Sequence, residues 1–333
     1  MLYCCYDPPR HADVTEADLD PEPDRREEDA AERLAGEFEA QRLRLRSVAY
    51  RMLGSISEAD DAVQEAWLRL SRVEPAGLQN LAGWLTTVVA RVCLNVLRTR
   101  AAHPEQQLSV HVPDPVVGGT EAGNPEHEAL LADAVGLALL VVLDALSPAE
   151  RLAFVLHDMF SVPYDDIASV AGCSVASARQ LASRARRRVS LAPVPDVDLA
   201  RQSQVVDAFF AASRHGDFAA LVALLDPDVV LRADGGPNRP QAAGLVSGAG
   251  AVAEQVLTYG PFVTFVRPAV VNAAAGAVVA PRGRVVSVMG FVVRGSRVVA
   301  IDVLADPVRL RSINFAGVDL GDRATVELGT PPR

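Results

Sequence analysis

A cluster of arginines occupies a stretch of the chain that has no acidic residues. Residues 167–195 contain no Asp or Glu. Their basic side chains are Arg179, Arg184, Arg186, Arg187 and Arg188. A guanidinium group is always charged and presents donors that match phosphate oxygens, so five of them without a counter-charge form a local basic patch. This pattern indicates a segment that binds nucleic acid.

The arginines belong to a pattern of two short helices joined by a tight turn. In residues 164–186 the small Ala168 allows the helices to approach, Gly172 permits the turn and Ser174 is a helix N-cap. This is the helix-turn-helix arrangement, whose second helix enters the major groove. The DNA-binding candidates are Ser174, Ala176, Ser177, Arg179 and Gln180 near the helix start, and Ser183, Arg184 and Arg187 further along, where phosphates lie. The alternative is an ordinary helical hairpin with a solvated arginine face.

Two all-α modules and an α+β domain are predicted to carry these residues. Apolar residues at helical spacing, such as Leu45, Val48 and Met52, indicate the first module at residues 37–102. Prolines and glycines predict a linker at 103–125, and the second helical module follows at 126–191, where Ser147 and Glu150 form a capping box. Helical patterns followed by strand-like runs predict an α+β domain with an antiparallel sheet at 200–313. Residues 314–333 are a C-terminal tail.

The charge of the chain is unevenly distributed. The net charge is −10, but residues 1–40 hold 13 acidic and 4 basic side chains, so the rest is nearly neutral. We expect residues 1–36 to form a disordered acidic tail. The four cysteines, Cys4, Cys5, Cys93 and Cys173, lack metal-ligand spacing, and no apolar run of about 20 residues is evident. A cytoplasmic protein with no metal, no cofactor and no membrane partner is expected.

The helical modules resemble regions 2 and 4 of the extracytoplasmic-function (ECF) sigma factors, the bacterial RNA polymerase subunits that recognise promoters. The matching motifs are residues 49–54, 60–70, 81–85 and 146–151, together with the helix-turn-helix. The resemblance implies core RNA polymerase as a partner, through its β′ clamp and β flap, and promoter DNA as the other. It implies that Asp60, Asp61, Gln64 and Glu65 face the clamp. Alternatively, acids near a helix start only favour the helix dipole.

The same resemblance assigns the end of the first module to promoter opening. Gln79 and Asn80, in the polar segment before a helix, are the candidates for base contact, and Arg98 and Arg100, with Arg91, are the candidates for phosphate contact. Trp84 could stack on a base, but a Trp in an apolar helical stripe is more often part of the core.

Residues 200–313 resemble the SnoaL-like branch of the NTF2-like cone fold, and a subgroup of ECF sigma factors carries such a fused domain. The similar stretches are residues 206–212, 224–236 and 305–310, together with the linker segment 111–115. The resemblance implies an in-chain regulator. Its expected contacts are Asp234, Gly235, Gly236, Asp306, Pro307, Arg309 and Leu310. The chain departs from the subgroup at Pro237 and Asn238, where Gly and Lys are usual. It also departs in the closing motif, which normally begins with Asn and carries Lys, whereas this chain has Asp306 before Pro307 and Arg309 after it.

Two other functions are compatible with parts of the sequence. Cone folds also host enzymes that use a carboxylate with a Tyr or His in an apolar pocket, and a small-molecule ligand is possible there. The candidates are Asp226, Asp234, Asp302, His215 and Tyr259, although no informative spacing links them. A regulator that binds DNA without polymerase would account for the helix-turn-helix but would leave residues 49–70 unexplained. The leading hypothesis is a non-enzymatic ECF sigma factor with a fused regulatory domain.

Overall fold

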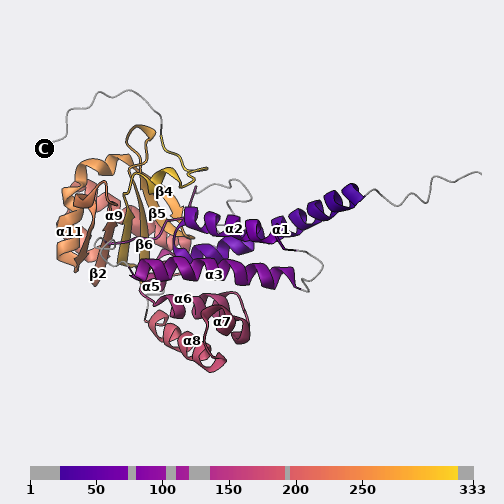
Figure 1. Ribbon diagram of the computed structural model, residues 1–333. Coiled ribbons are helices and arrows are strands. Elements are labelled where there is room, and N and C mark those ends of the chain that lie inside the picture. Colours follow the sequence, from indigo (N-terminus) through magenta and orange to yellow (C-terminus); the bar gives the residue numbers. More distant parts are fainter. Residues whose placement is uncertain (1–22, 74–79, 103–109, 120–135, 192–195, 322–333) are drawn as a thin grey trace, which may run out of the picture. The chain divides into compact units, whose positions relative to one another are not determined.

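The computed structural model describes residues 23–73, 80–102, 110–119, 136–191 and 196–321 (Figure 1). The chain divides into two units, residues 1–41 and 42–333. The described part of the first unit is the beginning of helix α1 (Pro23–Leu53). This helix starts inside the stretch 1–36 that was expected to be a tail, because its Glu, Ala and Arg residues have high helix propensity. Residues 1–22 lie outside the described part.

The first helical module consists of the end of α1 with α2 (Ile56–Leu70) and α3 (Leu81–Ala102). The predicted stripes are buried, including Leu45, Val48 and Met52 on α1 and the alanines and Leu70 on α2. Ser55 is the N-cap of α2, and its hydroxyl accepts a hydrogen bond from the Glu58 amide. The helical periodicity of the sequence therefore predicts this core.

The second helical module contains the predicted helix-turn-helix. Its elements are α5 (Leu137–Asp144), α6 (Pro148–Phe154), a π-helical turn (Val155–Met159), α7 (Tyr164–Ala171) and α8 (Val175–Val189). The capping box of Ser147 and Glu150 is present at the start of α6. Gly172 ends α7 with a φ of 69°, a conformation that costs glycine least. The turn and caps of the sequence prediction are confirmed.

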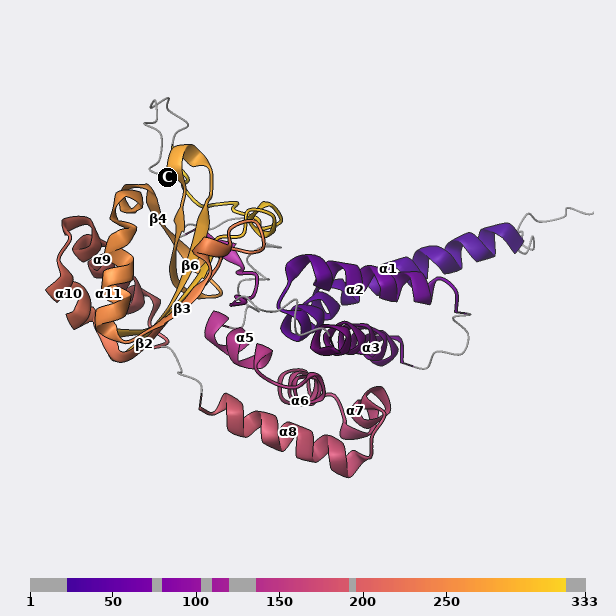
Figure 2. The ribbon, with the colours of Figure 1, turned by 60° about the vertical axis from the view of Figure 1, so that its left-hand side comes forward.

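The C-terminal domain is an α+β fold in which three helices cover one face of a sheet (Figure 2). The helices are α9 (Leu199–His215), α10 (Phe218–Leu224) and α11 (Ala249–Thr258). The strands are β2 (Leu225–Asp234), β3 (Gly244–Ser247), β4 (Val266–Val271), β5 (Ala274–Val279), β6 (Ser287–Arg294) and β7 (Arg297–Leu304). This confirms the expected α+β domain.

The sheet is mixed, whereas an antiparallel sheet was expected. Its order is β1-β4-β5-β6-β7-β2-β3, and β2 pairs with β7 in parallel, with Leu231 opposite Ile301. The parallel pair arises because β7 returns beside β2 after the long excursion through α11 and β4–β6. Strand β3 and helix α11 were absent from the sequence prediction, since their residues show short, weakly periodic patterns.

Three phenylalanines fill the space between the helices and the inner face of the sheet. The rings of Phe209, Phe210 and Phe291 meet edge to face, with centroids 5.4 to 5.6 Å apart. On the opposite face Ala138 of α5 packs with Val292 and Ala300. The first helix of the second module therefore lies on the outer face of the C-terminal sheet.

Part of the predicted linker belongs to the C-terminal sheet. Val117 and Gly118 form strand β1, which pairs antiparallel with Val271 and Val270 of β4. Residues 112–118 are buried. The description of 103–125 as a plain linker is wrong for this segment, because its apolar and carbonyl groups find partners on another domain; residues 103–109 and 120–125 lie outside the described part.

Candidate functional sites

The start of α8 presents the side chains that were predicted to reach base edges. Ala176, Arg179 and Gln180 are exposed. The Ser174 hydroxyl accepts a hydrogen bond from the Ser177 amide at 3.1 Å, so Ser174 caps the helix and orients its first turn. The Arg179 guanidinium lies 5.6 Å from the centroid of the Tyr164 ring. This surface has the polar and cationic groups that readout of a major groove requires.

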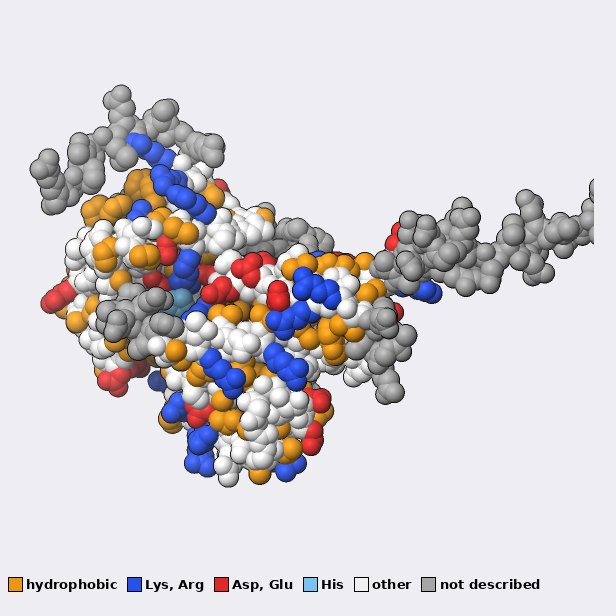
Figure 3. All heavy atoms as spheres, in the orientation of Figure 1, with side chains coloured by type: hydrophobic (Ala, Val, Ile, Leu, Met, Phe, Trp, Pro, Cys, Tyr) orange, Lys and Arg blue, Asp and Glu red, His pale blue; other side chains and the backbone are white. Residues whose placement is uncertain are grey.

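The later arginines of α8 lie on the same module, whose exposed arginines are visible in Figure 3. Glu150 forms ion pairs with Arg184 at 3.3 Å and Arg188 at 3.1 Å, and both arginine side chains are more than half exposed. The Glu150 side chain is only 8% exposed, so the two guanidinium groups compensate a buried carboxylate while their outer faces remain open to solvent. Arg187 is exposed and Ser183 is half-buried.

The predicted clamp-binding residues of α2 lie at the surface, and two of them form ion pairs with arginines of the same module. Asp61 and Gln64 are exposed. Asp60 accepts two hydrogen bonds from Arg46, at 2.5 and 3.0 Å, and Glu65 pairs with Arg69 one turn away at 2.9 Å. Asp61 and Gln64 therefore provide the cleaner test of docking, because reversing the charge of Asp60 would place two cations side by side.

The two candidates for base contact in the first module differ in outcome. Gln79 lies outside the described residues, and Asn80 is exposed. The Asn80 side chain accepts a hydrogen bond from the Gly83 amide at 2.9 Å, which caps α3. Trp84 is half-buried, so its side chain is neither fully part of the core nor fully accessible to an unpaired base.

The arginines of α3 contact other parts of the protein. Arg98 donates to the carbonyl oxygen of Ala171 at 3.1 Å and Arg91 to the Ser169 hydroxyl at 3.3 Å, both on α7. Arg100 donates to the Leu53 carbonyl and pairs with Glu58. Cations that were expected to hold promoter phosphates thus hold the helix-turn-helix or their own module.

Arg309 joins the linker to the C-terminal domain. Its guanidinium donates to Asp114 at 2.6 Å, to Asp234 at 2.7 Å and to the carbonyl oxygen of Val112 at 2.5 Å. The Val112 amide in turn donates to Asp234 at 3.0 Å. The structure therefore brings together two of the predicted regulatory residues, Asp234 and Arg309, around the linker. We call this cluster with Val112 and Asp114 the linker latch.

A second set of contacts extends the latch to the first module. Asn272 accepts from the Val116 amide at 3.0 Å and donates to the Tyr50 hydroxyl at 3.1 Å. The Tyr50 hydroxyl donates to the Asp114 carbonyl at 2.5 Å. Burial raises the pKa of Tyr50, which keeps this donor protonated. Sequence reasoning missed Tyr50 and Asn272, because a single Tyr or Asn carries no spacing signal.

The charge of Asp234 is stabilised by its partners. Burial alone would raise the pKa of this carboxyl, but the hydrogen bonds from His111 and Val112 and the charge of Arg309 together lower it below 3.8. His111 lies 3.5 Å from Asp234 and 3.8 Å from Asp144 at the end of α5. The latch therefore contains a carboxylate that stays ionised near neutral pH.

The remaining predicted regulatory residues pack beside the latch. Gly236 has a φ of 62°, and a Cβ there would lie 2.2 Å from Asp306 Oδ2. A Cβ on Gly235 would meet the Arg239 carbonyl at 2.1 Å. Only glycine allows these close approaches. Pro307 and Leu310 line a neighbouring pocket.

The candidate catalytic residues of the C-terminal domain are not gathered in one place. Asp302 pairs with Arg232 at 2.6 Å, and it lies opposite Gly290, whose added Cβ would meet Leu137 of α5. Asp302 therefore points to the outer face of the sheet, away from the phenylalanine-filled interior. Tyr259 and His215 are exposed, and Asp226 caps a turn through the Asp228 amide. Among the described residues, no group of His, Cys, Asp and Glu has a metal-binding arrangement.

The comparisons with known proteins agree with the two helical modules. Residues 38–103 match the family Sigma-70 region 2, and residues 136–189 match the family Sigma-70, region 4. The ECF RNA polymerase sigma factor SigJ of Mycobacterium tuberculosis is 42% identical over 232 residues, which cover 68% of this chain and 74% of SigJ. The chain belongs to the ECF RNA polymerase sigma factors. Such a sigma factor binds core RNA polymerase and directs transcription initiation at specific promoters.

A second relative and a solved structure show how much of this sigma factor the similarity covers. The probable ECF RNA polymerase sigma factor SigI of M. tuberculosis is 38% identical over 196 residues, covering 58% of the chain and 67% of SigI. The crystal structure of SigJ is similar with a TM-score of 0.68 at 37% identity, covering 84% of this chain and 99% of that one. The two helical modules alone cannot supply such a share, so the similarity includes the fused α+β domain.

One helix of the sigma factor is apolar enough to cross a membrane by length and composition. Among the described residues, this helix is α3, Leu81–Ala102. It lies within the match to region 2, and Leu85, Val89 and Leu94 are buried in that module. Its hydropathy is therefore accounted for by a protein core. The sequence analysis identified no such apolar run because α3 also contains arginines.

Proposed function

We propose that the C-terminal domain of this sigma factor is an in-chain regulator that holds the promoter-reading modules in a closed arrangement. The observation that carries the proposal is the linker latch, in which Arg309 and Asp234 hold a linker segment that connects region 2 to region 4. Tyr50 and Asn272 add region 2 to the same network. Helix α5 of region 4 packs on the sheet of the same domain. The C-terminal domain thus contacts region 2, region 4 and the linker between them, and regions 2 and 4 must separate to reach two promoter elements.

The closed arrangement competes with DNA for the same arginine side chains. One Arg98 N–H donates to the Ala171 carbonyl of α7, so a promoter phosphate would have to share this guanidinium group with the helix-turn-helix. In the open arrangement, the α8 start reads the upstream element and the end of α3 contacts the downstream element. Release of the latch is therefore expected to raise promoter binding, because it removes an internal competitor held at high effective concentration.

We further propose that the exposed face of α2 binds the β′ clamp of core polymerase, with Asp61 and Gln64 at its centre, and that region 4 contacts the β flap. The activity places the protein in the cytoplasm, and it requires neither a cofactor nor a membrane. Asp61→Arg should abolish co-purification with core polymerase. The matched control is Glu254→Arg, an exposed acid on α11 of the C-terminal domain. Equal binding of both variants would remove α2 from the docking surface.

The regulatory role is tested by in vitro transcription with purified core polymerase on promoter fragments selected by the wild-type sigma factor. Arg309→Met removes the latch and should raise transcription severalfold at limiting sigma factor. Arg214→Met changes an exposed arginine in the last turn of α9, outside the latch, and should leave transcription unchanged. Equal activity of the two variants, with intact polymerase binding, would show that the closed arrangement does not limit initiation.

A further inference from the structure

A pocket with four arginines and an apolar wall lies beside the linker latch. It has a volume of about 520 Å³, within the roughly 300 to 1,000 Å³ typical of small-molecule sites. Its polar lining comes from Arg239, Arg282, Arg284 and Arg311, and its apolar lining comes mainly from Val286, Leu310 and Phe315. No acidic side chain is among the lining residues. The pocket is therefore electropositive on one side and hydrophobic on the other.

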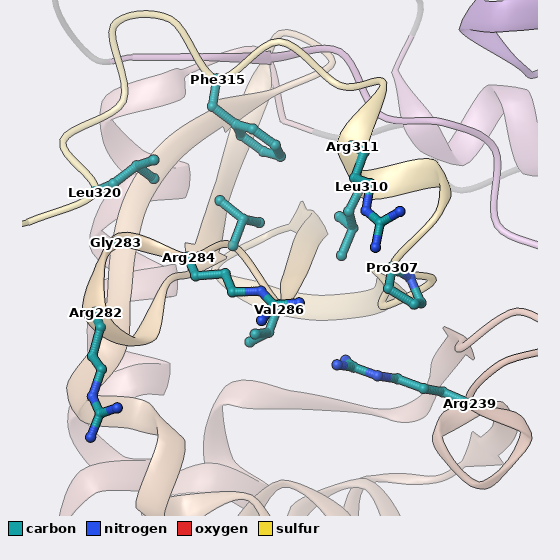
Figure 4. A pocket seen from close by; sticks show the side chains of 11 residues that line it. Arg239, Arg282, Gly283, Arg284, Val286, Pro307, Leu310, Arg311, Phe315 and Leu320 are labelled. Atoms are coloured by element: carbon teal, nitrogen blue, oxygen red, sulfur yellow. The ribbon is translucent and has the colours of Figure 1, made fainter. Parts of the chain in front are cut away.

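Three of the four lining arginines have no ion-pair partner within the described part of the chain. Arg239, Arg284 and Arg311 form no ion pair or side-chain hydrogen bond there. Figure 4 shows these three side chains extending toward the space below the Phe315 ring, whereas Arg282 points away from it. Like charges gathered at one cavity repel each other, and a bound anion would relieve that repulsion.

We propose that this pocket binds a small organic anion that combines a phosphate or carboxylate group with an aromatic or acyl body. The guanidinium groups of Arg239 and Arg311 would hold the anionic group by charge-assisted, bidentate hydrogen bonds. The apolar body would lie against Leu310, Phe315 and Val286. A nucleic-acid backbone fits less well, because a phosphate chain has no apolar part to cover that wall.

The pocket and the linker latch share one turn of the backbone. The residues Arg309–Arg311 form a single 3-10 turn in which Arg309 faces the linker and Arg311 lines the pocket. Arg239 follows the loop of Gly235 and Gly236, which abuts Asp306. Ligand binding is thus positioned to alter the latch. This coupling rests on the proposed regulatory role, whereas the binding itself does not.

Calorimetric titration of the full chain tests the proposal with three probes. 1-Naphthyl phosphate carries both features, inorganic phosphate carries only the charge, and 1-naphthol carries only the apolar ring. We expect the naphthyl phosphate to bind at least tenfold more tightly than either of the others. Equal affinities for naphthyl phosphate and inorganic phosphate, or for naphthyl phosphate and naphthol, would overturn the proposal.

Paired variants assign the binding to this pocket. R239Q with R311Q should weaken binding of naphthyl phosphate at least tenfold. R294Q with R297Q removes the same charge from the exposed β6–β7 hairpin and should leave the affinity unchanged. A thermal melt of each protein checks that both fold. Equal losses in the two double variants, or no binding of naphthyl phosphate at millimolar concentration, would refute the site. The transcription assay of Arg309→Met is independent of these results.

Discussion

Replacement of Arg309 by Met should release the linker from the C-terminal domain without unfolding that domain. Removing one partner of a fully buried ion pair costs about 3 to 5 kcal/mol. The Arg309 side chain is 20% exposed, and its carboxylate partners Asp114 and Asp234 are 1% and 5% exposed. Partial solvent access on the arginine side reduces the cost to about 2 to 3 kcal/mol. At about 1.4 kcal/mol per tenfold, the unlatched fraction rises roughly 30- to 140-fold.

Hydrogen exchange followed by mass spectrometry measures this fraction directly. The amides of Val112, Asp114 and Val116 donate to Asp234, the Gly54 carbonyl and Asn272 in the latched form. Their protection in a peptide covering residues 110–118 should fall by the same factor, because exchange reports the open population. Peptides from β6 and β7 should keep wild-type protection. Arg214→Met, at the exposed end of α9, provides the control.

Two results would refute this reasoning. Unchanged protection of residues 110–118 in Arg309→Met would mean that the three hydrogen bonds of the guanidinium do not hold the linker. Equal loss of protection in β6 and β7 would mean that the substitution unfolds the domain, and the free-energy argument would then concern folding and not the latch.

Three other variants test separate parts of the structure. Arg179→Ala should change discrimination at particular bases by about 1 to 3 kcal/mol, whereas Arg187→Ala should weaken all sequences alike and lower the salt slope by about 1, as read from binding isotherms at several salt concentrations. Tyr50→Phe should loosen the linker by about 1 to 3 kcal/mol in the same exchange experiment, because it leaves a buried linker carbonyl without its donor. Burial raises the pKa of Asp302 above 3.8 despite the nearby Arg232 guanidinium, so the wild type loses stability as the pH rises through that raised value. Asp302→Asn does not titrate, and its melting temperature relative to wild type should therefore rise from pH 4 to pH 7; a constant difference would show that Asp302 is ionised throughout.

Local sequence signals predicted much of this fold. The helix-turn-helix depends on Gly172 and the Ser174 cap, and the capping box at Ser147 depends on residues three positions apart, so short-range chemistry determines both. The buried stripes of α1 and α2 follow from one helical period. These features are set within a few residues of the chain, which is why a single sequence is sufficient to find them.

The contacts that join the modules depend on distant residues and were harder to foresee. Tyr50 and Asn272 are 222 positions apart, and neither forms a recognisable motif. Asp234 and Arg309 were found only because their stretches resemble a known family. The parallel pairing of β2 and β7 depends on the path of the whole domain, which local propensity does not encode.

Strand β1 also determines when the sigma factor can close during its synthesis. Its partner β4 and the Arg309 side chain lie far downstream, and Arg309 follows Gly118 by about 190 residues. At 5 to 20 residues per second the ribosome needs roughly 10 to 40 s to add them. The second DNA-reading module is complete only near residue 191, so for the last roughly 120 of these residues, about 6 to 24 s, both modules have been made and the latch does not yet exist. On the proposed regulatory role, a nascent chain is an unregulated sigma factor during that time, and any translation product that stops before Arg309 remains one.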